Sequence, residues 1–133
     1  AAYQGRVACF GTTKGELIWA RDFSSVSGMT MDSRNVYVTD EKSAIVAFDR
    51  ANGASHWKQD KLLGRNVTAP ALAGRFIAVG DLQGYVHFIS RDDGSFVARI
   101  ATDGSPVVAQ PVTFEEHVIV QTLKGGVYAI SVQ

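Results

Sequence analysis

This sequence of 133 residues has one cysteine and three prolines, carries no net charge and contains no long apolar run. A single cysteine, Cys9, cannot form an internal disulfide, and its place between apolar neighbours predicts a buried thiol. Thirteen basic residues balance thirteen acidic ones, which argues against a nucleic-acid partner because phosphate binding needs clustered cations. No apolar run reaches the length of about 18 residues that a membrane-spanning helix needs.

A helical period of apolar residues is also missing. Turn signals recur every 8 to 12 residues instead, and they separate short runs rich in β-branched and aromatic residues, such as Asn35–Thr39. Both features predict an all-β chain of short antiparallel strands.

One strand-turn-strand pattern is repeated along the chain. It occurs at Gly5–Trp19, Ser43–Trp57 and Gly84–Ala98, and it begins again at Gly125, with starts separated by 38, 41 and 41 residues. A period near 40 residues with several strands in each copy is typical of a β-propeller.

The repeat divides the single domain into residues 1–23, 24–60, 61–101 and 102–133. We expect a partial propeller with two whole four-stranded antiparallel blades, flanked by an incomplete blade at each end. A closed ring needs at least about 160 residues and commonly about 280–320. We therefore expect the chain to be the C-terminal part of a larger propeller of eight blades, completed by a missing N-terminal segment. Its end blades would expose apolar faces and unpaired strand edges.

Glycine is the fixed residue of the repeated turn. Gly15, Gly53 and Gly94 each end a four-residue polar turn, where a left-handed backbone conformation closes a hairpin. Pro70, Pro106 and Pro111 lie in or before the first predicted strand of a repeat, Val67–Leu72 or Val107–Thr113. Because proline is disfavoured inside strands, they predict a bulge or a strand start.

Motifs for catalysis or metal binding are not evident. His56, His87 and His117 occupy three different positions of the repeat, and no cysteine or histidine pair has zinc spacing. We interpret His87, between Val86 and Phe88, as a buried histidine with a hydrogen-bond partner. The stretch of residues 11–15 does not have the residue spacing of a phosphate loop, and it leads into a predicted strand instead of a helix. No catalytic, cofactor-binding or metal-binding residue is assigned.

The loop after residue 60 holds the strongest candidate for a protein-binding site. Leu62 and Leu63 are adjacent apolar residues in a polar connection, and Arg65 follows. An exposed leucine pair with arginine could anchor a partner, whereas the alternative is that one leucine folds back and caps the blade. Exposed strand edges are a second possible binding site.

Ala47, Phe48 and Asp49, followed by Gly53 and Trp57, resemble the PQQ-like (quinoprotein-type) propeller repeat. In that family the tryptophan docks onto the neighbouring blade, which implies that role for Trp19 and Trp57. The third copy has Ala98 at the equivalent position, which implies a differently packed junction.

Within that family, the segments Gly80–His87, Asp92–Ala98, Asp60–Leu63 and Gly126–Ile130 resemble the propellers of the outer-membrane protein assembly machinery of Gram-negative bacteria. This resemblance implies a periplasmic scaffold without catalysis or quinone cofactor, tethered by a lipid anchor. Its implied partners are the POTRA domains of the barrel-inserting protein BamA, other subunits of the machinery and unfolded outer-membrane proteins. A fragment of a PQQ-dependent dehydrogenase and a ligand-sensing propeller are the alternatives.

Overall fold

Four antiparallel sheets make up the part of the structure that can be described. The computed structural model describes residues 5–10, 17–23 and 26–132. The first sheet pairs β1 (Gly5–Phe10) with β2 (Leu17–Phe23), and the second holds β3 (Val26–Met31), β4 (Asn35–Asp40), β5 (Ile45–Asp49) and β6 (Ser55–Gln59). The third holds β7 (Ala71–Ala73), β8 (Phe76–Gly80), β9 (Tyr85–Ser90) and β10 (Phe96–Ala101), and the fourth β11 (Val112–Phe114), β12 (His117–Gln121) and β13 (Val127–Ser131).

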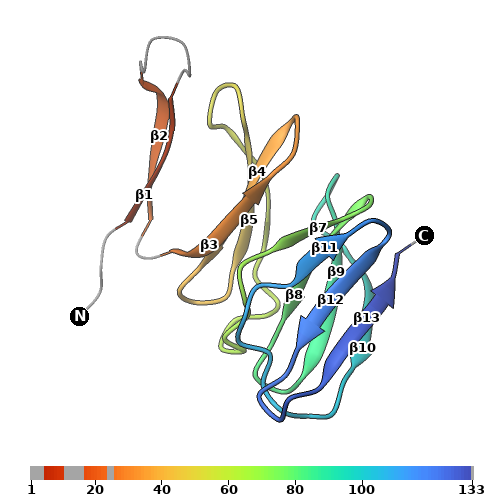
Figure 1. Cartoon of the computed structure of the whole chain (residues 1–133). Helices are drawn as coiled ribbons and strands as arrows, with labels where there is room; N and C mark the ends of the chain where they lie inside the picture. Colours follow the sequence, from red (N-terminus) through yellow and green to blue (C-terminus); the bar gives the residue numbers. More distant parts are fainter. Residues whose placement is uncertain (1–4, 11–16, 24–25, 133) are drawn as a thin grey trace.

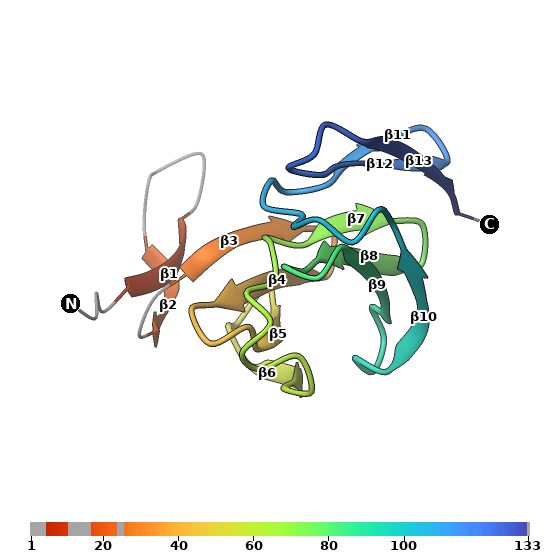
Figure 2. The ribbon, with the colours of Figure 1, turned by 90° about the horizontal axis from the view of Figure 1, so that it is seen from below.

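The sheets follow one another around a common centre like the blades of a propeller (Figures 1 and 2). In the second, third and fourth sheets the strands are adjacent in chain order, and the first strands lie at the inside, where β7 contacts both β3 and β11. The prediction of an all-β partial propeller is confirmed. Within the described ranges no helix exists that could span a bilayer.

The innermost strands are shorter than the sequence predicted. The strand predicted at Val67–Leu72 is β7, which begins only after Pro70, and the one predicted at Val107–Thr113 is β11, which begins only after Pro111. Residues before each proline bond elsewhere: the Thr68 amide donates to the Gly80 carbonyl at 2.9 Å, and the Val107 amide to that of Asp81, also at 2.9 Å. The expectation of a strand start is thus met at Pro70 and Pro111 but not at Pro106, which precedes no strand directly, and the predicted strand lengths are wrong.

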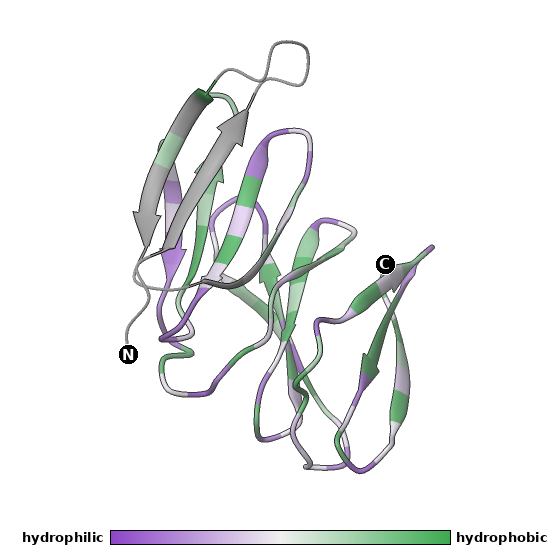
Figure 3. Cartoon of the chain, turned by 60° about the vertical axis from the view of Figure 1, so that its left-hand side comes forward, coloured by the Kyte–Doolittle hydropathy of each residue, from purple (hydrophilic) through white to green (hydrophobic). Residues whose placement is uncertain are grey.

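Apolar side chains fill the two spaces between the last three sheets. In Figure 3, which colours the ribbon by hydropathy, the hydrophobic stretches lie mainly on the strands. The cluster between the second and third sheets contains Tyr37, Ile45, Ala47, Trp57, Leu62, Val67, Ile77, Val79 and Ile89. The cluster between the third and fourth sheets contains Ala73, Ala78, Val86, Phe88, Val107, Val118 and Val120. Because both faces of the third sheet are covered, β8 and β9 are apolar almost throughout.

A β-bulge interrupts the last hairpin of the first three sheets at the same repeat position. The extra residues in the register are Ile18, His56 and Val97, each directly before Trp19, Trp57 or Ala98. A bulge adds local twist and changes the direction of the neighbouring side chain. The sequence pattern did not reveal this feature, since a bulge leaves no gap in the repeat spacing.

Candidate functional site

Trp57 joins the second sheet to the third. It lies on β6, and its indole Nε1 donates a hydrogen bond to the backbone carbonyl of Arg91 at 2.9 Å. The ring covers Gly94, where an added Cβ would lie 2.5 Å from Cε3 of the indole. Gly94 also has a φ of +76°, so both space and backbone conformation require glycine there. Gln59 adds a hydrogen bond from Nε2 to the Gly94 carbonyl at 2.7 Å.

Arg91 also forms an ion pair across this joint. Its Nη1 lies 2.7 Å from Oδ2 of Asp32, and the Tyr37 hydroxyl donates to the same oxygen at 2.8 Å. Burial alone would raise the pKa of Asp32, but hydrogen bonds from the Asn35 and Arg34 amides and from Tyr37, together with Arg91, lower it. Burial and the adjacent Asp32 raise the pKa of Tyr37 to about 12. The joint therefore combines packing, hydrogen bonds and a charge pair.

The loop after residue 60 separates the three residues that the sequence singled out. Leu62 is only 3% exposed and belongs to the cluster between the second and third sheets, whereas Leu63 is 53% exposed. Arg65 is partly buried, and its Nη1 donates to Asp81 Oδ2 and to Gln83 Oε1, both at 3.0 Å. The two leucines are thus not an exposed pair: Leu62 packs inward and Leu63 faces solvent.

Asp81 is the fully buried centre of a polar cluster beside this loop. Its Oδ1 accepts hydrogen bonds from the amides of Gln83 at 2.8 Å and Tyr85 at 3.0 Å. Asp40, one repeat earlier, supports its own turn in the same way. The other oxygen of Asp81 accepts from Arg65 and from His87 Nε2, the latter at 2.8 Å. One carboxylate therefore receives four hydrogen bonds.

The ionisation of this cluster follows from its contacts. Burial alone would raise the pKa of Asp81, but the hydrogen bonds from His87, Tyr85, Arg65 and Gln83 lower it, so the carboxylate is ionised. Burial lowers the pKa of His87, and the charges of Arg65 and Arg99 add to this, against the opposing effect of Asp81. His87 is therefore neutral near pH 7, and it donates from Nε2 to the ionised carboxylate.

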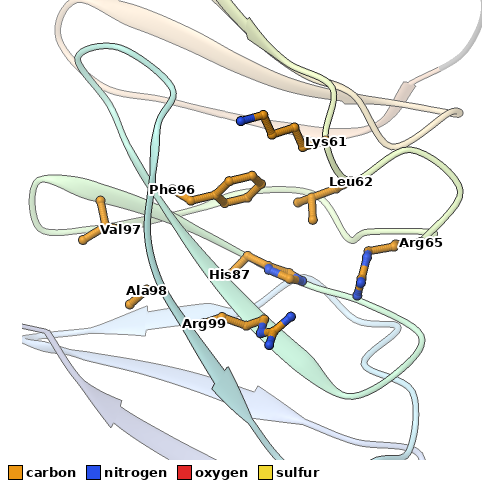
Figure 4. A pocket seen from close by; sticks show the side chains of 8 residues that line it. All are labelled: Lys61, Leu62, Arg65, His87, Phe96, Val97, Ala98 and Arg99. Carbon is orange, nitrogen blue, oxygen red and sulfur yellow. The ribbon is translucent and has the colours of Figure 1, made fainter.

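A pocket of about 380 Å³ opens next to this cluster, between the loop after residue 60 and β10. Its lining consists of Lys61, Leu62, Arg65, His87, Phe96, Val97, Ala98 and Arg99. Figure 4 shows the rings of Phe96 and His87 and the side chain of Leu62 around the opening, with Arg99 and Arg65 at one end. The ring centroids of Phe96 and His87 are 6.1 Å apart. Three cations border this pocket, and no acidic residue lines it.

Several predicted residues stand apart from this pocket. Gly53 and Gly94 both have positive φ, of 74° and 76°. Gly15 and the side chains of Trp19 and Cys9 lie outside the described residues. His56 is exposed and lies 3.2 Å from Asp49 Oδ2. Among the described residues, no group of three acidic, histidine or cysteine side chains could hold a metal ion.

Sequence reasoning did not identify Asp81, Phe96 or Arg99 as part of a site. Asp81 can be recognised as a repeated turn residue, because Asp40 lies one repeat earlier. That repetition does not show which of the two carboxylates is buried. His87 stands where the preceding repeat has Val46. This exchange of an apolar for a polar residue on an inward strand position is the signal that could have located the cluster.

Comparisons with known proteins give one consistent result. A family model described as outer membrane protein assembly factor BamB matches residues 1–59. The BamB of Bordetella pertussis is 47% identical over 130 residues, which are 97% of this chain and 34% of that protein. The BamB of Yersinia pestis is 34% identical over 98% of this chain and 33% of its own length. The chain thus spans about a third of the length of the curated relatives it matches.

Solved structures agree with the sequence comparison. The crystal structure of BamB from Moraxella catarrhalis has a TM-score of 0.86 with 28% identity, covering 94% of this chain and 37% of that one. A quinohemoprotein alcohol dehydrogenase from Pseudomonas putida has a TM-score of 0.66 with 18% identity, covering 77% of this chain and 18% of that one. At that identity the second likeness concerns the fold alone.

Proposed function

We propose that this chain, a propeller segment that is similar to BamB over nearly its whole length, serves as a non-catalytic scaffold in outer-membrane protein assembly. The observation that carries the proposal is the similarity of nearly the whole chain to curated assembly factors named BamB. The proposed location is the periplasmic side of the outer membrane, reached through a lipid anchor. The proposed partners are the POTRA domains of BamA, other subunits of the machinery and unfolded outer-membrane proteins.

The geometry supports a scaffold because the second and third sheets are fixed to each other. Trp57 and the pair of Arg91 with Asp32 bridge these two blades. Loops and strand edges on fixed blades lose little conformational entropy when a partner binds, which favours affinity. Leu63, Arg65 and Lys61 form the surface that we propose as a contact for a protein partner.

The alternative of a PQQ-dependent dehydrogenase rests on a likeness in fold alone. A shared propeller fold does not imply a shared function, because function depends on the site that the fold carries. The proposed scaffold role instead rests on sequence similarity to named assembly factors.

Complementation tests the proposed function in cells. In a Gram-negative strain whose own BamB has been deleted, we expect the full-length protein to restore the amount of folded barrel proteins in the outer membrane. The readout is the fraction of a heat-modifiable barrel protein that runs as the folded species on a gel. A full-length protein that is exported and stable but restores none of this fraction would contradict the proposal.

A further inference from the structure

We propose that the pocket beside β10 binds a carboxylate that lies next to an apolar side chain on a segment of a protein partner. This inference rests on the proposed scaffold function and specifies the chemistry of one of its contacts. The cations Lys61, Arg65 and Arg99 line this pocket together with Leu62, Phe96 and His87.

Charge is the first argument for an acidic occupant. Lys61, Arg65 and Arg99 contribute three positive charges, and His87 is neutral near pH 7 because burial and the two arginines lower its pKa. Asp81, which accepts hydrogen bonds from Arg65 and His87, is fully buried behind them. Its single negative charge leaves a net positive environment at the opening, which is complementary to an anion.

Arg65 and Arg99 both carry guanidinium N–H groups that have no hydrogen-bond partner within the described part of the chain. Arg65 makes both of its side-chain hydrogen bonds through Nη1, to Asp81 and Gln83, so Nε and Nη2 have no hydrogen-bond partner among the described residues. Arg99 stacks its guanidinium 4.5 Å from the centroid of the Tyr85 ring. Arg65 is thus held by two hydrogen bonds from one nitrogen and Arg99 by one ring contact, and both guanidinium groups have further N–H groups available. This arrangement suits a carboxylate, which pairs with guanidinium groups through parallel hydrogen bonds.

Apolar surface is the argument for a peptide segment and against a free ion. Phe96 is 39% exposed and Val97 is 50% exposed, although both are large apolar residues. A small anion would leave them in contact with water. On a peptide segment, a carboxylate side chain would pair with the cations while a leucine-like neighbour covered the apolar surface. Arginine and aromatic residues are also enriched in protein interfaces.

Fluorescence anisotropy with a defined peptide tests the proposal. The probe is a short labelled peptide with one glutamate between two leucines in a serine background, and its partner peptide carries glutamine instead. We expect the full-length protein to bind the glutamate peptide about tenfold more tightly, because a charged hydrogen bond is lost in the other. Arg99→Gln should weaken binding of the glutamate peptide about tenfold and leave the glutamine peptide unchanged.

Arg75→Gln is the matched control, because Arg75 is an exposed arginine that does not line the pocket. It should leave both peptide affinities unchanged. Equal affinity for the two peptides, or no effect of Arg99→Gln, would overturn the proposal, as would full displacement of the probe by millimolar acetate at constant ionic strength. If Arg99→Gln has no effect on binding while the protein still restores barrel assembly, the pocket proposal fails and the scaffold function stands. A wild-type protein that restores nothing contradicts the scaffold function whatever the peptide does.

Discussion

Trp57→Ala is expected to lower the free energy of unfolding of the complete protein by about 3–5 kcal/mol, the range for removing a large aromatic side chain from a packed site. The indole fills the space between the second and third sheets, lies 6.0 Å from the Tyr37 ring and covers Gly94. Its loss also leaves the Arg91 carbonyl without this donor. Urea denaturation followed by circular dichroism gives the change.

A double-mutant cycle with Gly94 separates docking from a general loss of stability. Gly94→Ala alone should be strongly destabilising, because its Cβ would lie 2.5 Å from the indole and its φ is +76°. In the Trp57→Ala background only the cost of positive φ remains, roughly 1–2 kcal/mol. The two effects should therefore be less than additive. Fully additive effects, or a loss below about 1 kcal/mol for Trp57→Ala, would show that this contact does not join the blades.

Asp81→Ala is the second substitution with a large expected effect. Removing the buried carboxylate takes away the acceptor of Arg65 and His87 and leaves the charge of Arg65 without its partner. Loss of one member of a buried ion pair typically costs about 3–5 kcal/mol. The amides of Gln83 and Tyr85 also lose their acceptor, which should loosen the turn. The free energy of unfolding in urea at pH 7 measures the effect.

Gln83→Ala is the control for Asp81, because its side chain accepts an exposed hydrogen bond from the same Nη1 of Arg65 and carries no charge. We expect this change to cost less than about 1 kcal/mol.

The stabilisation by Asp81 should also depend on pH. The pKa of Asp81 is lowered in the folded protein, so the contribution of its carboxylate to stability is complete above the unfolded pKa of about 3.9 and is lost as pH falls through the folded pKa. The difference between wild type and Asp81→Ala should therefore shrink below about pH 4. A difference that grows on acidification would contradict the assignment.

The repeat made the fold predictable, because the same strand-turn-strand pattern occurs several times along the chain and each copy confirms the spacing of the others. Pro70 and Pro111 even indicated where the inner strands begin. Their lengths were not predictable, since the Thr68 amide donates to Gly80 at the end of β8 and the Val107 amide donates to Asp81 in the turn that follows. Local propensity does not record such tertiary hydrogen bonds.

The pocket could not be predicted from the repeat, because it is formed by loop packing and by residues that are distant in the sequence. Leu62 and Leu63 are neighbours of the same type, and only the packing of the loop buries one and exposes the other. Arg65 and Arg99 lie 34 positions apart in the sequence, and they meet because β10 returns beside the loop after residue 60. Side chains that break the repeat, such as His87, are the clue to this kind of site.

A titration of the complete protein with the soluble POTRA region of BamA, with free PQQ as a parallel ligand, distinguishes the scaffold function from the dehydrogenase alternative. We expect saturable binding of the POTRA region and no binding of PQQ. Arg75→Gln should bind like wild type. Binding of PQQ without any binding of the POTRA region would contradict the scaffold function and favour the dehydrogenase alternative.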